Sequence, residues 1–373
     1  MIGVEGQYIF KFSIGSKKDF IATNDLERFV IIEECGNVLP TWEIEFSSED
    51  KELLEVFHEG NPLEVSYGVT KDDMVDTKLS ISKKVVSRYG DQKYYFIAKG
   101  VYYALSYITT PQIQVTDKKS GLEVVKSIAG NHFEMDASKE TSSDKQNWIQ
   151  PNVSDKQFVE EVWKHSWLPN SFVGIGITTD GKFIIRDMKK QMKKDYDFNF
   201  SNKAEDGIKY LGNLTIESNG GFLNTWMGYE REKFLYALEK GEVNKEKEKL
   251  KTIITDKFLR NSDVKKRSSE HDMLSENVHE NYWNAYLRNL GGLALFSTES
   301  IELSFLNDLK HIKVLDNVML KEDEPDSDKE KSSIYQSGKF LVGLVSRSLS
   351  SNMFTTTVQL YRESINDAKG KIS

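Results

Sequence analysis

The sequence predicts a mainly β protein of the α+β class, in which two antiparallel β regions flank an α/β region. Three observations predict this class. Short runs of β-branched and aromatic residues, separated by turn residues, fill the first hundred positions. Similar runs return towards the C-terminus, and a helix-capping signal and a hairpin signal lie between the two β regions.

The N-terminal segment 1–109 contains runs that alternate apolar and polar residues, as half-buried strands do. The runs are QYIFKFSI, RFVIIEE, TWEIEFSS, PLEVSYG, TKLSISKKVV and KYYFIAKGVYYALSYITT. Turn signals such as ECGNVLP separate them. Short strands at this spacing favour an antiparallel barrel or sandwich.

The middle segment 110–195 changes character. Ser154 and Gln157 have the spacing of a capping box, which predicts a helix that starts at Asp155. That helix would bury Phe158 and Trp163 on one face. The run FVGIGITTDGKFIIRD then predicts a hairpin, and Trp148 is expected to pack in the same α/β domain.

The remainder returns to strand-like runs, interrupted by charged stretches. We expect a second β domain, a charged helical insertion and a flexible tail, in the ranges 196–235 with 296–365, 236–295 and 366–373 respectively. The acidic loop 321–333 is too polar to fold alone.

Charge and cysteine content narrow the class of protein. The chain has 373 residues, with 50 basic and 58 acidic side chains and a net charge of −8, which argues against a surface that grips phosphate backbones. Cys35 is the only cysteine, so no intramolecular disulfide can form. No signal peptide or bilayer-length apolar run is evident, so we expect a soluble protein made inside a cell.

The run NWIQPNVSDKQFVEEVWKHSW contains the residue types of a catalytic triad, Ser154, Asp155 and His165. On a helix, positions 155 and 165 lie about 15 Å apart along the axis, so they cannot form a hydrogen-bonded pair. Ser154 is better used as a helix cap. We therefore expect structural roles for these residues.

Other chemical signatures are weak. The histidines lack metal-ligand spacing, the glycines fit neither a dinucleotide nor a phosphate loop, and the acid pairs lie among solvated neighbours. The tryptophans are expected to pack in the interior or at an interface. We predict a chain with no catalytic residues, no cofactor and no metal.

Three motifs, in order, resemble the central hub family of contractile phage tail baseplates, which is related to the hub half of type VI secretion spike proteins. They are RFVIIEECGNVLPTWEIEFSS…LLEVFHEGNPLEVSYG, NWIQPNVSDKQFVEEVWKHSW…ITTDGKFIIRD and YQSGKFLVGLVSRSLSSNMFTTTVQLYRES. The third is similar to the strands that close the second tube-type barrel of the family. Those strands would include Gly338, Val342, Thr356 and Arg362.

The resemblance implies two tube-type β-barrels per subunit and a homotrimer with pseudo-six-fold symmetry. Such a ring would adapt a six-fold tail tube to a three-fold spike. Its partners would be the spike protein, tail tube proteins, baseplate wedge proteins and the tape-measure protein. DNA would pass through its channel without specific binding, and the protein would reside in the virion tail baseplate, without membrane insertion.

Two other functions stay open on the sequence alone. One is a β-rich carbohydrate-binding or glycan-hydrolysing protein, with tryptophans as sugar platforms and two acids as catalysts. The other is a different tail component, such as a tail tube or distal tail protein. The net negative charge further suggests that acidic side chains repel DNA from the channel wall.

Overall fold

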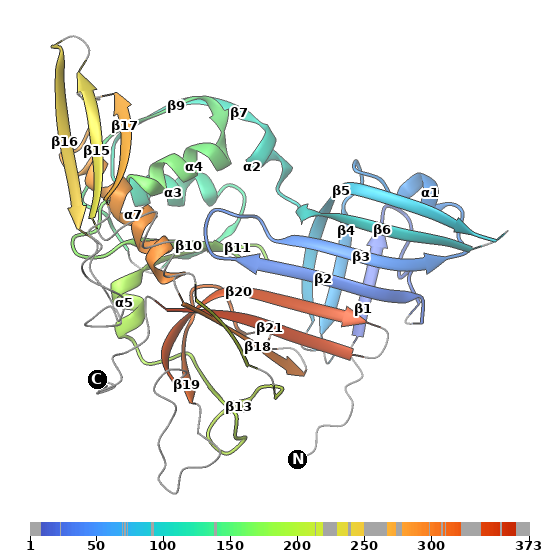
Figure 1. Cartoon of the computed structure of the whole chain (residues 1–373). Coiled ribbons are helices and arrows are strands. Elements are labelled where there is room, and N and C mark those ends of the chain that lie inside the picture. The colour runs from blue at the N-terminus through green and yellow to red at the C-terminus, as the bar shows by residue number, and fades with distance from the viewer. Residues whose placement is uncertain are drawn as a thin grey trace, which may run out of the picture.

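The computed structural model describes residues 9–22, 24–68, 70, 72, 74–90, 93–137, 140–212, 214–218, 230–237, 240–249, 267–273, 278–297, 299–306, 309, 311–321, 337–350 and 353–362. In these ranges the chain is mainly β, as the sequence predicts. One thirteen-stranded sheet dominates the fold, and three smaller sheets and several short helices accompany it (Figure 1). No helix in the described ranges is long and apolar enough to cross a membrane.

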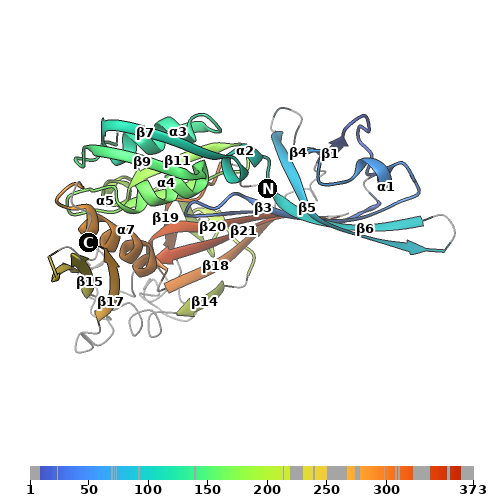
Figure 2. The same cartoon turned by 90° about the horizontal axis from the view of Figure 1, so that it is seen from above.

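The N-terminal half of the large sheet is entirely antiparallel. Its strands follow the order β1 (Ile9–Ile14), β4 (Leu63–Gly68), β5 (Val75–Tyr89), β6 (Lys93–Tyr102), β3 (Thr41–Ser48) and β2 (Leu26–Glu34). The short helix α1 (Leu53–Val56) packs Leu53 into the core beneath these strands. Figures 1 and 2 show the β5–β6 hairpin extending well beyond the other strands of this half.

The C-terminal half continues from β2 without a break. Strand β20 (Gly338–Ser350) pairs antiparallel with β2, and β21 (Met353–Arg362), β18 (Glu299–Leu306) and β14 (Leu214–Ser218) follow in that order. A second branch leaves the start of β20 through β19 (Asn317–Lys321), β12 (Phe198–Ser201) and β13 (Ile208–Lys209). Two pairings in this branch, β12–β19 and β12–β13, are parallel.

The expected pair of barrels is replaced by this single open sheet. Among the described residues β1 pairs only with β4, and β14 pairs only with β18, so the pairing closes no ring. The N-terminal half is nevertheless strongly curled, because the ring of Phe12 on β1 lies 5.3 Å from that of Phe29 on β2. Right-handed twist and aromatic packing curl the strands without joining their edges.

Two apolar cores lie on one side of the large sheet. Leu349 on β20 packs in the N-terminal core with Phe46 and Phe96, whereas Val345 on the same strand packs in the C-terminal core with Phe305. Residues 345 and 349 share a face because side chains alternate along a strand. The opposite face of the shared strands is therefore free of both cores.

The third core belongs to the α/β region. Its elements are α2 (Leu105–Thr109), β7 (Pro111–Lys119), α3 (Gly121–Ala129), β8 (Glu134–Ala137), β9 (Gln146–Ser154), α4 (Asp155–Lys164), β10 (Val173–Ile177), β11 (Lys182–Asp187) and α5 (Met188–Lys193). The predicted hairpin is present, since β10 and β11 pair antiparallel across a turn at Gly181, whose φ is 79°. Such a φ favours glycine.

The range 236–295, predicted to be a helical insertion, is only partly helical. It contains α7 (Tyr282–Phe296), but a three-stranded sheet precedes the helix, formed by β15 (Glu230–Ala237), β16 (Glu242–Lys249) and β17 (Arg267–Met273). Lys245 and Lys247 of β16 both pair with Glu232 of β15, at 2.9 and 3.2 Å. Most of the acidic loop 321–333 and the whole tail 366–373 lie outside the described residues.

Candidate functional site

The candidate site is the face of β20, β21 and β18 that lies opposite the cores. Register pairs Ser346 with Thr357 and Ser348 with Thr355, and Thr357 in turn pairs with Ser304. We call this surface the polar face and define it by its uncharged polar members, Ser304, Ser346, Ser348, Ser350, Thr355, Thr357 and Gln359. All seven are half-buried by their neighbours in the sheet, and the residues between them are buried.

The polar face has a distinct chemistry. Within residues 302–306, 344–350 and 353–361 it carries no lysine or arginine, since Arg347 points into the interior. Ser304 and Thr357 share a hydrogen bond of 2.9 Å between their hydroxyl oxygens. Carboxylates flank it on the same side of the sheet, with Glu302 on β18 and Glu43 on β3. The polar face is rich in hydroxyl groups. Its border at β18 is acidic, whereas its border towards β3 and β6 carries both signs, since Arg28 and Lys99 project on the same side as Glu43.

A buried ionic group fixes the junction behind the polar face. Arg347 Nη1 lies 3.2 Å from Glu33 Oε1, and both side chains are buried. The backbone N–H and the hydroxyl of Thr179 each donate to the same carboxylate oxygen at 2.8 Å. The hydroxyl of Tyr67 lies 3.2 Å from that of Thr179. Strands β2, β4 and β20 and the β10–β11 hairpin thus meet at one carboxylate.

The four C-terminal residues singled out in the sequence lie on β20 and β21. Val342 and Thr356 are fully buried. Gly338 begins β20 with a φ of 133°, where a side chain would be strained and would approach Arg362. Arg362 donates to the carbonyl of Ser337 at 3.1 Å, and burial lowers the pKa of its guanidinium to about 10. Val342 belongs to the C-terminal core, and Gly338 and Arg362 stand at the ends of β20 and β21.

The residues expected in the middle domain lie together in the third core. The capping box is present: the Ser154 hydroxyl accepts from the N–H of Gln157, whose side chain accepts from the N–H of Ser154. Phe158 and Trp163 are buried on one face of α4, and the Trp163 indole donates to the carbonyl of Val173 at 2.9 Å. The indole of Trp148, also buried, donates to the carbonyl of Lys119 at 3.0 Å.

Asp155 does meet a histidine, but it is His132 and not His165. Asp155 Oδ2 lies 2.7 Å from His132 Nε2, and Ser106 Oγ lies 3.3 Å from His132 Nδ1. Sequence reasoning missed this Ser–His–Asp chain, because its members come from separate elements. Ser106 is exposed on a five-residue helix and lines neither of the hollows around Tyr102 and Tyr95. These three side chains connect α2, the turn after α3 and α4.

His165 ends α4 inside an aromatic cluster. Its ring stacks on Tyr282 of α7, with centroids 3.6 Å apart, and lies edge-on to Trp283. Burial, together with Lys233 and Lys164, lowers the pKa of His165 well below its usual range. The imidazole packs as an aromatic ring between Tyr282 and Tyr286.

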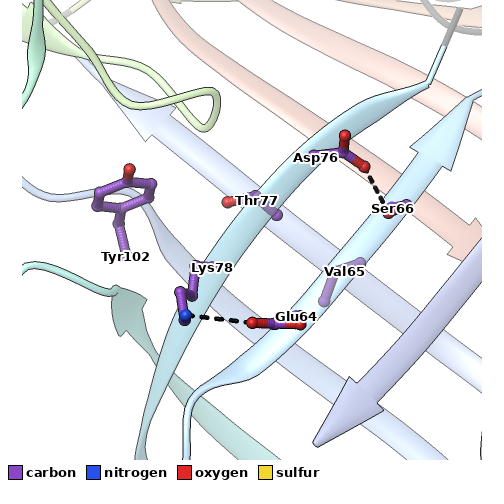
Figure 3. A pocket seen from close by; sticks show the side chains of 7 residues that line it. All are labelled: Glu64, Val65, Ser66, Asp76, Thr77, Lys78 and Tyr102. Carbon is purple, nitrogen blue, oxygen red and sulfur yellow. Dashed lines mark hydrogen bonds and ion pairs between the residues drawn. The ribbon is translucent and has the colours of Figure 1, made fainter. Parts of the chain in front are cut away.

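A shallow hollow of about 360 Å³ lies between the β4–β5 strand pair and Tyr102 (Figure 3). Its charged groups are already satisfied, since Lys78 Nζ lies 3.1 Å from Glu64 Oε1 and Asp76 accepts from Ser66. Glu64 and Asp76 are both exposed. A pair of carboxylates can act as general acid and general base when burial separates their pKa values. Glycan hydrolysis gains no support from this hollow.

Comparison with solved structures shows which known proteins share this fold. No protein-family model matches the chain, and no curated protein sequence matches it. The crystal structure of a tail protein from Neisseria meningitidis MC58 superposes with a TM-score of 0.61 at 12% identity, covering 96% of this chain and 99% of that one. The 43 kDa tail protein of prophage MuSo2 from Shewanella oneidensis gives 0.62 at 9%, covering 95% and 98%.

The E. coli c3393 protein is a further match. It is described as a component of the type VI secretion system with structural similarity to the T4 tail proteins gp27 and gp5. Its TM-score is 0.53 at 11% identity, and the match covers 95% of this chain and 77% of that one. The present chain therefore has, over nearly its full length, the fold of phage tail proteins, the type of fold that the sequence motifs predict.

Proposed function

We propose that this chain is the central hub of a contractile tail baseplate, in which three copies form a ring that joins a six-fold tail tube to a three-fold spike. One observation carries the proposal: β20 fuses two β halves into one sheet whose cores lie on one side and whose other side is the polar face. Two fused halves per copy give six β units in a trimer. Each half stands in for one tube-type barrel.

The polar face suits the wall of a channel that DNA crosses. Cations on a wall would bind phosphate groups and release counterions, so DNA would be held in the channel. Apolar patches would favour association. The hydroxyl groups do neither, and the Glu302 carboxylate at the β18 border repels a polyanion. Leu306 and Met353 are exposed on the same side at the end of these strands, so this chemistry belongs to the stretch of hydroxyl groups between them and Glu302. The passage of DNA without binding rests on this chemistry.

The same proposal sets the partners and the location. The ring would contact the spike at one end and tail tube proteins at the other, with wedge proteins around it and the tape-measure protein inside. Its role would be structural and not enzymatic, within the virion tail. The fold likeness to the two phage tail proteins and the secretion component supports this assignment.

The test is the mass and shape of the assembled protein. Native mass measurement should give a trimer, and particle images should show a six-lobed ring around an open channel. A chain that stays monomeric, with and without its spike, would contradict the hub. Binding of the monomer to glycans would instead favour a carbohydrate-binding protein.

A further inference from the structure

Two strand edges of the large sheet are unpaired in the part of the chain that the structure describes. Strand β5 pairs with β4 from Val75 to Leu79, but from Ser82 onward its only partner is β6. At the other end of the sheet, β14 pairs with β18 alone. Unpaired edges expose backbone donors and acceptors and are ready to accept another strand.

The two edges have opposite charge. The segment 77–102 contains six basic residues and one acidic residue, in a chain whose net charge is −8. Lys83 and Lys99 are exposed and lie directly opposite each other on β5 and β6. Like charges in this position destabilise a strand pair. Glu43 on β3 lies opposite Lys99 within the chain, and a negative partner surface at the free edge would face Lys83.

The β14 edge supplies such a surface. Strands β14 and β18 contain three glutamates and no basic residue. Glu217 and Glu302 are exposed and project on the same side of the sheet as Lys83 and Lys99. Two exposed acids at the β14 edge thus project on the same side of the sheet as two of the six basic residues at the β5 edge.

Exposed aliphatic side chains accompany the charges at both edges. Val85 is 43% exposed on the same side as Lys83, and Leu306 is 51% exposed on the same side as Glu302. Ile216, 42% exposed, projects from the opposite side of β14. Apolar side chains next to charged ones are common in protein–protein contacts.

We infer that copies of this chain join edge to edge, the free part of β5 in one copy pairing with β14 of the next. The inference rests on the proposed ring and names the contact that closes it. Such a head-to-tail contact joins two different surfaces, and it closes into a ring when each copy is rotated by a fixed fraction of a turn. The sheet would then run through all copies, and the polar face would form one continuous wall.

Exposed lysines on an edge strand also protect many proteins against unspecific pairing. The two uses are distinguishable, because a protective lysine needs no acidic partner, whereas the contact needs both charges. A reciprocal charge exchange separates them.

The experiment compares K83E/K99E, E217K/E302K and the combination of all four substitutions by native mass measurement over a concentration series. Each pair alone should raise the concentration needed for half-assembly at least about tenfold, and the combination should restore it. The matched control is K119E/K193E, which makes the same charge change at two exposed positions on β7 and α5. It should assemble like the unaltered chain.

Hydrogen exchange gives a second readout that does not depend on charge. Amides in residues 82–88 and 214–218 should exchange slowly in the assembled protein and quickly in the monomer. A trimer that tolerates both charge pairs and leaves these amides unprotected would overturn the edge contact while leaving the hub intact. A chain with no oligomer under any condition would overturn both.

Discussion

Glu33 on β2 and Arg347 on β20 form an ion pair of 3.2 Å across the only strand pair that joins the two halves of the described sheet. The pair is fully buried, and the carboxylate also accepts from Thr179. Strands β2 and β20 and the β10–β11 hairpin all meet at this ion pair. A substitution of either side chain should therefore weaken the contacts among all three.

We expect R347M to reduce the free energy of unfolding by about 3–5 kcal/mol, because it leaves the Glu33 carboxylate buried without its counter-charge. Urea unfolding measures the loss. The double variant E33Q/R347M should recover much of it, since it removes both charges. A double variant as unstable as R347M would show that the charge of Glu33 is not the cause.

Trp163→Ala should cost about 3–5 kcal/mol, the range for emptying a buried aromatic site. The side chain is 4% exposed and its indole donates to the carbonyl of Val173. Trp163→Phe keeps most of the volume but loses the donor, so it should cost less. A thermal unfolding midpoint shifted by less than about one degree in the alanine variant would contradict the burial.

Ser154→Ala should cost about 1 kcal/mol, because the N–H of Gln157 loses its side-chain acceptor at the start of α4. Ser154→Asp provides a matched control, since aspartate caps helices as well as serine does. Urea unfolding of both variants is the measurement. Equal losses in both would mean that packing around Ser154, and not its hydrogen bond, is what the alanine variant loses.

We expect the free energy of unfolding to fall as the pH rises, because the carboxyl group of Asp316 is buried. Burial, helped by Asp197, raises the pKa of this carboxyl from 3.8 to about 7, although it accepts from the N–H of Lys313 at 2.8 Å. A raised folded pKa adds stability that is complete below the unfolded value and is lost as pH rises through the folded value. The loss therefore spreads over about pH 4 to 7.

Asp316→Asn should remove this pH dependence, because the amide oxygen can still accept from Lys313 and carries no charge. Urea unfolding at pH 5 and pH 8 should show a smaller difference in the variant than in the unaltered chain. An unchanged difference would place the titration elsewhere.

The sequence predicted the features that depend on near neighbours. The capping box needs only Ser154 and Gln157, three positions apart, and the β10–β11 hairpin needs only its turn at Gly181. Contacts between residues far apart in the chain could not be predicted from the sequence. Glu33 and Arg347 are 314 positions apart, and His132, in the turn after α3, meets Asp155 only once α3 and α4 have packed.

The prediction of a helix was wrong for the charged segment Glu242–Lys249, which forms strand β16. The run EVNKEKEK is rich in residues with high helix propensity, so a helix was predicted. In the fold, pairing with β15 brings Lys245 and Lys247 to the buried Glu232, and this tertiary contact outweighs local preference. The polar face was also missed, although serine at every second position in SRSLS and threonine in FTTT mark its side of β20 and β21.

Because β20 is shared, pulling one half of the protein away from the other would load the backbone hydrogen bonds of the pairs from Phe29–Leu349 to Glu34–Leu344. Force directed along these strands would strain all of those bonds at once instead of breaking them one after another. A tail sheath that contracts drives its tip hard against a surface. In the proposed hub, a part built around a common strand would carry that thrust from tube to spike as one stiff body.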